Sequence, residues 1–515
     1  MKLKDIYFGK IDAKNELTED SDAQKEAFEQ AYLVPEYVDL DSIEDGRKYI
    51  ISGLKGIGKT ALLRYVDIQL RKNQNNLTSF ILFKSDFSSE DRKAFYLKSQ
   101  SVVDDEEIKE VGDLRDFESI WKWFFFQYIY NCIKDEANNY FNKDDTNWKM
   151  YEKCIQCVSA VGDPVVKGIS RFIPKIKKGQ ITISKPGFAV EVGFTLGDNN
   201  KIKFSDLVHK TEQFFDGLQA TGNKKLYLLV DELEISYEVK RQYERDVRIV
   251  RDLVAITEKL NSIFRRNHYP IYIIASIRSE VLNVANATGK EINKCVEDFG
   301  IQIVWHQAGG SEHDHPLIQM IMKRLIAAEG LEDTADNREK VWNQYFPDKT
   351  VQNQPVERYI LYNSWFRPRD IVRMLTKGQN CFPNLDSFTH RVFDGIRKMY
   401  STDSWTECME ELKASYTNEQ ISAIENVFNG WQPNFTREDI RKRINDLSKD
   451  DDRIKSISPN VDKLLEDLYR VGVIGNNYSV YGDDNKIRFV FRGDNKLLTD
   501  RRMMIHNALR PYFSL

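Results

Sequence analysis

The feature that most constrains the fold is a glycine-rich stretch, residues 47–60, with the sequence RKYIISGLKGIGKT. The apolar run 49–51 is typical of a buried parallel strand, and residues 61–66 continue with helical character. Between them, residues 53–60 fit the pattern G-x-x-x-x-G-K-[ST], and this strand–loop–helix context predicts a phosphate-binding loop. The backbone N–H groups of such a loop point at a polyphosphate, and the helix N-terminus adds partial positive charge. The predicted nucleotide-binding residues of the loop are Gly53, Leu54, Lys55, Gly56, Ile57, Gly58, Lys59, Thr60 and Ala61.

A second motif completes this pattern. The apolar run 226–230 ends in Asp231 and Glu232, and a buried strand of this kind delivers a carboxylate to the mouth of a parallel sheet. We expect Thr60 and Asp231 to hold Mg²⁺, while Lys59 reaches the β- and γ-phosphates. Glu232 would activate the attacking water. The acidic pair therefore favours hydrolysis over nucleotide storage.

A third apolar run, residues 271–275, ends in Ser276 and Arg278. The pattern resembles ASCE P-loop ATPases, and this resemblance implies that the strand lies between the phosphate-loop strand and the strand that ends in Asp231. There Ser276 would sense the attacking water, and Arg278 would stabilise charge on the γ-phosphate in cis or across a subunit boundary. The alternative is that Arg278 pairs with Glu280 at a helix start. Residues 301–305 are predicted to form the last core strand.

The C-terminal part of the chain is predicted to be mainly helical. Pro368 opens a helix with Arg367 and Arg369 at its N-terminal edge, where an arginine such as Arg369 could report on a γ-phosphate. The alternative is a surface helix with ordinary charges. Three helices (418–428, 436–447 and 460–471) followed by two strand runs (473–474 and 487–491) indicate a winged helix. The third of these helices carries more acidic than basic residues, which opposes binding in a DNA groove. We therefore favour a packing or partner module for this part.

Composition excludes several other classes of protein. The chain of 515 residues is 41% hydrophobic and 30% charged, with a net charge of −4, which fits a globular protein of several domains. The first residues lack the apolar core of a signal peptide, and the most apolar stretch, 120–130, is interrupted by Lys122. Six cysteines are too few for a disulfide framework. We expect a cytoplasmic protein with no membrane contact.

Three local patterns have both a functional and a structural interpretation. Cys154 and Cys157 form a lone CxxC, for which two inert cysteines on one helix turn are favoured over a zinc site. Residues 180–196 alternate around Pro186-Gly187 and predict a β-hairpin, preceded by lysines at 175, 177 and 178. The hairpin could touch nucleic acid or a partner, but a solvated edge is favoured. Arg241, Arg245 and Arg248 form a basic stripe on a predicted helix, 240–266, with no preference between a contact surface and a solvated face.

Together these motifs resemble the AAA+/STAND-like group of ASCE P-loop ATPases. The sequences FG at 8–9, DA at 12–13, FVFR at 489–492 and IHNAL at 505–509 resemble a poorly characterised bacterial P-loop ATPase family, sometimes found near phage-defence genes. The resemblance implies a three-layer αβα core with a parallel sheet, a helical lid and a winged-helix domain. It also implies nucleotide-gated assembly or signalling. The long stretch between Lys59 and Asp231 departs from compact members.

The expected organisation has four parts. They are an N-terminal helical segment (1–45), an ATPase core (46–310) with an insertion at about 85–205, a helical lid (311–400) and a winged-helix domain (401–515). ATP is the expected nucleotide, because Asn293-Lys294 is followed by Cys295-Val296 and so lacks a guanine signature.

The first hypothesis is an ATP-hydrolysing, Mg-dependent switch that controls self-assembly or a partner protein, with anti-phage defence as a setting. The alternative is a nucleic-acid-dependent ATPase of the origin-recognition or helicase-loading type. A third reading, a nucleotide-binding scaffold without turnover, is opposed by the acidic pair.

Overall fold

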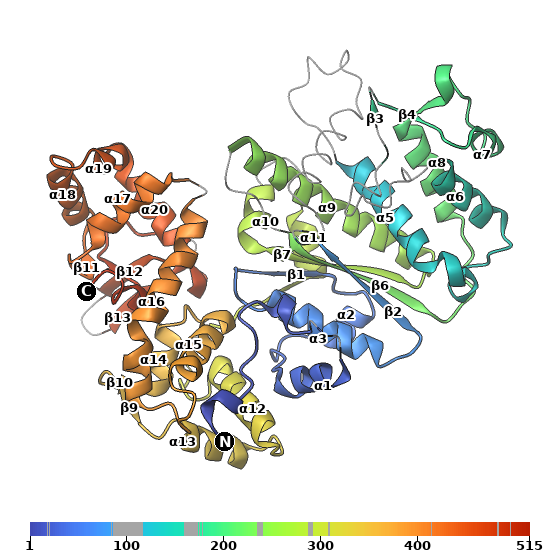
Figure 1. Cartoon of the computed structure of the whole chain (residues 1–515). Helices are drawn as coiled ribbons and strands as arrows, with labels where there is room; N and C mark the ends of the chain where they lie inside the picture. The colour runs from blue at the N-terminus through green and yellow to red at the C-terminus, as the bar shows by residue number, and fades with distance from the viewer. Residues whose placement is uncertain are drawn as a thin grey trace.

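The structure is a computed structural model that describes residues 1–17, 19, 21–83, 85, 117–158, 174, 176–177, 179–233, 240–286, 292–306, 310–413, 415–480, 484–494 and 496–515. Figure 1 shows an α/β part built around one parallel sheet and a mainly helical C-terminal part beside it. The N-terminus lies with the C-terminal part, next to α12 (Pro316–Glu329) and α13 (Ala335–Tyr345). The N-terminal segment therefore joins the two parts.

The central sheet has five parallel strands in the order β2-β6-β7-β1-β8. The strands are β1 (Ile50–Gly53), β2 (Asn76–Leu82), β6 (Lys225–Leu233), β7 (Ile271–Arg278) and β8 (Gly300–Gln302). Strand β7 lies between β1 and β6, which confirms the order expected from the sequence. It brings Ile51 opposite Ser276 and Gly53 opposite Arg278. Consecutive apolar residues suit this sheet because both of its faces are covered.

Helices cover both faces of the sheet, so the core has three layers (Figure 1). On one face, α3 (Lys59–Arg71) contacts the sheet, with α1 (Asp22–Ala31) outside it. On the other face lie α9 (Lys240–Arg266) and α10 (Ser279–Asn286), which both pack on β7. The short helices α2 (Leu40–Glu44) and α11 (Asn293–Phe299) flank β1 and β8. The α/β fold class with a three-layer core is thus confirmed.

The stretch between β2 and β6 is a largely helical insertion. Its helices are α5 (Glu118–Ile133), α6 (Thr146–Cys157), α7 (Pro186–Glu191) and α8 (Phe204–Asp216). Helix α5 is buried almost all round, as its aromatic sequence predicts, and carries four fully buried aromatic side chains in a row (123–126). Cys154 and Cys157 are buried on one turn of α6, and burial raises the pKa of each thiol to about 12.

The predicted β-hairpin across residues 180–196 is wrong. Its first half is β4 (Gln180–Thr182), but Pro186 and Gly187 open helix α7 and do not form a turn. Strand β4 pairs with β3 (Ile176–Lys177) and with β5 (Lys201–Lys203), which lies beyond the helix. Proline is favoured at the first helical position because its φ is already fixed. Of the preceding lysines, 175 and 178 lie outside the described residues.

The helical region that follows the core begins with α12, whose N-terminal cap is the His315 side chain. No group of three metal-ligating side chains occurs in the described part of the chain, and the loop before Pro316 acts as a cap. The further elements are α13, β9 (Thr350–Val351), β10 (Gln354–Pro355), α14 (Val356–Tyr362), α15 (Pro368–Cys381) and α16 (His390–Leu412). Helix α15 begins at Pro368, as predicted.

The C-terminal region contains the three predicted helices and an antiparallel sheet in the order β11-β14-β12-β13. Its elements are α17 (Asn418–Phe428), β11 (Asn434–Phe435), α18 (Arg437–Leu447), α19 (Asp452–Ile457), α20 (Val461–Arg470), β12 (Ile474–Val480), β13 (Asp484–Arg488) and β14 (Met503–Ile505). The second predicted strand ends at Arg488, and residues 490–492 form a 3-10 turn. Among the described helices, none has the length and apolar character that crossing a bilayer requires.

Candidate functional site

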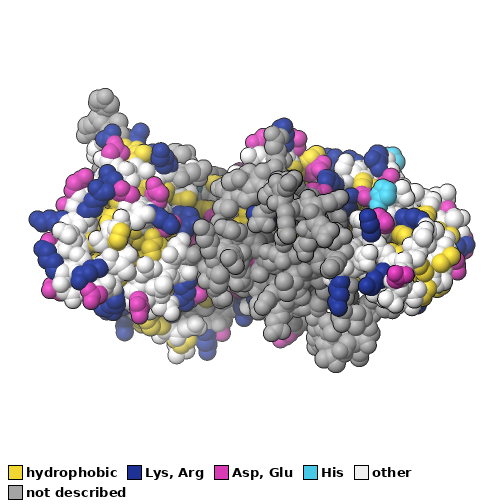
Figure 2. Space-filling model, turned by 90° about the horizontal axis from the view of Figure 1, so that it is seen from above, with side chains coloured by type: hydrophobic (Ala, Val, Ile, Leu, Met, Phe, Trp, Pro, Cys, Tyr) yellow, Lys and Arg dark blue, Asp and Glu magenta, His cyan; other side chains and the backbone are white. Residues whose placement is uncertain are grey.

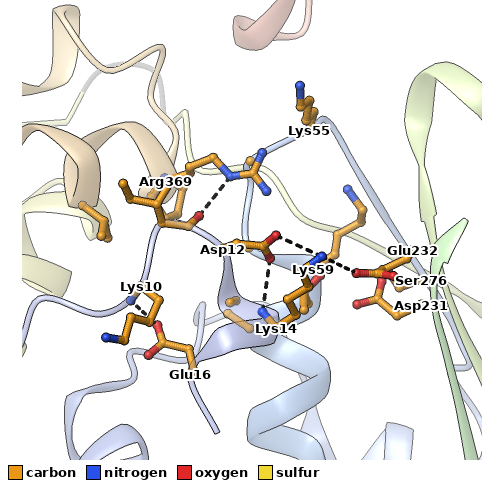
Figure 3. Close-up of a pocket in the computed structure, with 18 of the residues that line it drawn as sticks. Lys10, Asp12, Lys14, Glu16, Lys55, Lys59, Asp231, Glu232, Ser276 and Arg369 are labelled. Carbon is orange, nitrogen blue, oxygen red and sulfur yellow. Dashed lines mark hydrogen bonds and ion pairs between the residues drawn. The ribbon is translucent and has the colours of Figure 1, made fainter. Parts of the chain in front are cut away.

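The candidate site is an open cavity of about 1000 Å³ where strands β1, β6 and β7 end (Figure 3). Of the loop residues singled out in the sequence, Lys55, Gly56, Gly58, Lys59, Thr60 and Ala61 line it. From the other motifs, Asp231, Glu232, Ser276, Arg278 and Arg369 line it too. The structure therefore brings together residues from four separate parts of the sequence. Their chemical roles remain predictions.

Two glycines of the loop have left-handed backbone conformations. Gly56 has φ +77° and Gly58 has φ +102°, values that residues with a Cβ atom rarely adopt. Ile57 is buried beneath the loop, and its carbonyl accepts a hydrogen bond of 2.8 Å from the indole of Trp305. The carbonyl of Gly56 accepts one of 3.3 Å from the backbone N–H of Arg369. The loop is thus held by Trp305, which follows β8, and by the first residues of α15.

Lys59 folds back over its own loop. Its Nζ donates to the carbonyls of Gly53 at 2.9 Å and Leu54 at 3.0 Å. Burial, reinforced by the nearby Arg278, lowers the pKa of Lys59 to about 8. An anion in the cavity would counter both effects, because it offers the ammonium a partner of opposite charge.

Asp231 and Ser276 meet across adjacent strands. The Ser276 hydroxyl donates to Oδ1 of Asp231 at 2.6 Å. Burial raises the pKa of Asp231 even though Ser276, Thr60 and Lys59 act in the opposite direction. Its Oδ2 is buried without a hydrogen-bond partner among the described residues. An unpaired carboxylate oxygen beside the Thr60 hydroxyl fits a hard divalent cation such as Mg²⁺.

Glu232 reaches the cavity because the strand is irregular there. The pairing of β6 with β7 shifts register between Val230 and Leu233, and Glu232 has φ +58°. In a regular strand Asp231 and Glu232 would point to opposite faces, whereas a bulge re-aims a side chain. Oε2 of Glu232 accepts from the backbone N–H of Ser85 at 2.8 Å. Oε1 lies 3.3 Å from Nζ of Lys14. Left-handed backbone at a non-glycine residue is typical of functional sites.

The two predicted arginines reach the cavity from different parts of the chain. Arg278 stands at the end of β7 and lies near Lys59. Arg369 lies over the loop at the start of α15, and its Nε donates to the carbonyl of Ile11 at 3.2 Å. Its neighbour Arg367 is buried beside Asp370 and does not face the cavity.

Sequence reasoning missed the contribution of the N-terminal segment. This segment supplies Lys10, Ile11, Asp12, Ala13, Lys14 and Glu16 to the cavity wall. Figure 3 shows Lys14 between Asp12 and Glu232, facing the end of the sheet. The only sequence signal was the Asp12-Ala13 resemblance, which assigned no role to the lysine that follows it.

A second missed feature is an ion-pair network above the loop. Nζ of Lys55 lies 3.4 Å from Glu407 and 3.3 Å from Glu411, both on α16. Glu407 also pairs with Arg369 at 3.1 Å and with Arg373. Burial alone would raise the pKa of Glu407, but these cations hold it well below its usual range. The predicted phosphate-binding loop therefore contacts α16 directly.

Comparison with known proteins gives one partial similarity. Residues 315–408 match a family model described as the FunZ-associated C-terminal helical domain. The match runs from the cap of α12 into α16 and so includes Arg369 and Glu407. No curated protein matches the chain. The helical region above the cavity is thus similar to a domain associated with FunZ.

Proposed function

We propose that the chain binds Mg²⁺-ATP and hydrolyses it, and that its nucleotide state controls self-assembly or a partner protein. The observation that carries this proposal is the meeting of Lys59, Thr60, Asp231, Glu232, Ser276 and Arg278 in one cavity. A phosphate loop alone suits many ligands. Here the same cavity also contains an acidic pair and a strand that ends in a serine and an arginine. This combination suits phosphoryl transfer to water.

The charge of the cavity supports a polyanionic ligand. Four acidic side chains line it, and seven basic side chains outnumber them: Lys10, Lys14, Lys55, Lys59, Arg278, Arg324 and Arg369. A cavity lined mainly by one sign of charge attracts ligands of the opposite sign. In this assignment Lys59 contacts the β- and γ-phosphates, and Thr60 and Asp231 hold Mg²⁺. The cation would neutralise charge on the phosphates, while Glu232 orients and deprotonates the attacking water.

The contacts above the loop support a switch. Arg369 contacts Gly56, Ile11 and Glu407, so it touches the loop, the N-terminal segment and α16 at once. A phosphate that draws Arg369 or Lys55 toward itself would compete with their pairing to α16. Such differential contact is what a ligand needs to shift a conformational equilibrium. The proposed role in anti-phage defence rests on the motif resemblance alone.

The C-terminal region favours a protein readout over a nucleic-acid one. Asp462 on α20 pairs with Arg437 and with Arg441 at 2.8 Å, so two basic side chains there share one carboxylate. Figure 2 shows basic and acidic side chains interspersed over the C-terminal part of the face in view. The side chains of Arg241 and Arg245 lie outside the described residues.

Phosphate release from Mg²⁺-ATP tests the proposal. We expect wild-type turnover, and a loss of about 100-fold or more in Glu232→Gln with ATP binding retained, because a general base contributes on that order. The matched control is Glu410→Gln, an exposed glutamate whose pair is Lys413. Unchanged turnover in Glu232→Gln would contradict the assignment. Strong, salt-sensitive stimulation of turnover by duplex or single-stranded DNA would favour the nucleic-acid-dependent alternative.

A further inference from the structure

The inference concerns Lys14, a residue that no motif identifies. Lys14 lies in a short 3-10 helix, η2 (Ala13–Asn15), that packs against α3 behind the phosphate-type loop. Its Nζ is 3.3 Å from Oε1 of Glu232 and 3.7 Å from Oδ2 of Asp12 (Figure 3). The lysine therefore stands beside the carboxylate assigned to activate water.

The backbone that carries Lys14 is fixed on both sides of the cavity. Toward the lid, Arg324 donates to the carbonyl of Phe8, and Gln379 donates to that of Ile6 at 2.8 Å. Toward the core, η2 packs against α3, and the Asp12 side chain caps η2 by accepting from the backbone N–H of Lys14 at 3.2 Å. The lysine side chain itself is 34% exposed. Because the backbone is fixed and the four-carbon side chain is flexible, the ammonium of Lys14 can exchange partners without a movement of the backbone.

The position of Glu232 defines where a terminal phosphate would lie relative to Lys14. A base that activates water sits one water molecule away from the phosphorus, with hydrogen bonds of about 2.6–3.2 Å on the base side. The Lys14 ammonium lies 3.3 Å from that carboxylate. It is thus within reach of the third phosphate of a nucleoside triphosphate. A diphosphate ends one phosphate group farther away.

We propose that Lys14 binds the terminal phosphate of ATP and thereby distinguishes ATP from ADP. This inference rests on the proposed function. Binding exchanges the ion pair between Lys14 and Glu232 for one between Lys14 and the phosphate. Oε1 of Glu232 is then released next to the attacking water only when a triphosphate is present. Lys14 is a cation beside Glu232, since Glu232 and Asp12 raise its pKa more than burial lowers it.

Equilibrium binding of Mg²⁺-ADP and of Mg²⁺ with the non-hydrolysable analogue AMP-PNP tests this inference. In Lys14→Met we expect AMP-PNP affinity to fall about fivefold with ADP affinity unchanged, the scale of one partly exposed ion pair. Lys14→Arg should restore the discrimination because it keeps the charge. The matched control is Lys4→Met, an exposed lysine of the same segment, which should bind both nucleotides as wild type does.

A Glu232→Gln background separates phosphate contact from simple neutralisation of Glu232. If Lys14 touches the phosphate, Lys14→Met costs AMP-PNP affinity in that background too. Loss of the effect there, or an equal effect on ADP and AMP-PNP, would overturn the inference and leave the proposed function standing. Failure of the wild type to bind either nucleotide would overturn the proposed function, and the inference with it. A thermal melt of each variant verifies that it is folded.

Discussion

Glu407→Gln should loosen the contact between the candidate site and α16. The Glu407 carboxylate is surrounded by three cations, namely Lys55 at 3.4 Å, Arg369 at 3.1 Å and Arg373. Its side chain is 18% exposed, so solvent screens these pairs only partly. The amide of glutamine keeps nearly the same shape but removes the charge. The substitution therefore tests the electrostatic contribution without opening a cavity.

The contacts that survive limit the expected loss of stability. Arg373 keeps Asp370 at 2.8 Å, Lys55 keeps Glu411 at 3.3 Å, and Arg369 keeps the carbonyl of Ile11. The cost should thus be smaller than the 3–5 kcal/mol of a buried pair that loses its only partner. We expect about 2 kcal/mol, in the range of hydrogen bonds to charged groups. For a cooperative unit of about 200 residues this lowers Tm by about 5 °C.

The sign of the pH dependence follows from the depressed pKa of Glu407. A carboxyl whose pKa is lower in the folded than in the unfolded chain stabilises the fold above its unfolded pKa, about 4.3, and loses that contribution as pH falls toward the folded value. The difference in Tm between wild type and Glu407→Gln should therefore be complete at pH 7. It should begin to shrink below about pH 4.3.

Differential scanning calorimetry of full-length wild type, Glu407→Gln and Glu410→Gln measures these differences. Glu410 is on the same helix but 57% exposed, so its substitution should change Tm by no more than about 1 °C. Equal shifts in the two variants would refute the reasoning, because they would mean that the network contributes no more than a surface pair. A difference that grows below pH 4 would refute the sign.

Two further predictions concern the thiols and the loop. Cys381 is the exposed member of the six free cysteines. Burial raises the pKa of Cys132 to about 11 and that of Cys295 to about 12. Titration of the native protein with a thiol reagent should therefore show one fast-reacting group, and the substitution Cys381→Ser should remove it. Gly58→Ala should lower stability by about 1–2 kcal/mol, because Gly58 has φ +102°. Gly187→Ala should be neutral or stabilising in the same thermal melts, because Gly187 lies in helix α7 with open space around it. Equal effects of the two glycine substitutions would contradict this account.

Contiguous patterns explain which parts of the core were predictable. The loop at 53–60 and the acidic pair at 231–232 each lie within a few residues, and their flanking apolar runs fit a sheet covered on both faces. The place of β7 in the sheet followed from the resemblance to ASCE P-loop ATPases, to which Ser276 and Arg278 at its end contributed. The start of α15 followed from Pro368, because proline is preorganised for a first helical turn.

The errors and omissions have equally specific reasons. The hairpin prediction took Pro186-Gly187 as a turn, although the same dipeptide opens helix α7. Alternating polar and apolar residues over a short stretch do not distinguish a hairpin from a strand followed by a helix. In the structure β4 pairs with β5, which lies beyond helix α7. Lys14 and Glu407 were missed because their partners, Glu232 and Lys55, lie far away in the sequence. Only the fold brings such pairs together, and no spacing rule connects them.

The path from the cavity to the C-terminal region runs through α16. Glu407 and Glu411 face the loop, while Trp405 on the same helix packs edge-to-face on Phe513 at 4.9 Å. A helix transmits a displacement at one turn to the next because its backbone hydrogen bonds resist stretching. If a phosphate competes for Lys55 and Arg369, the ion pairs of these two side chains with α16 weaken. The contacts of Trp405 are then the nearest contacts with the C-terminal region that would change. The C-terminal surface is therefore where a nucleotide-dependent partner contact should be sought first.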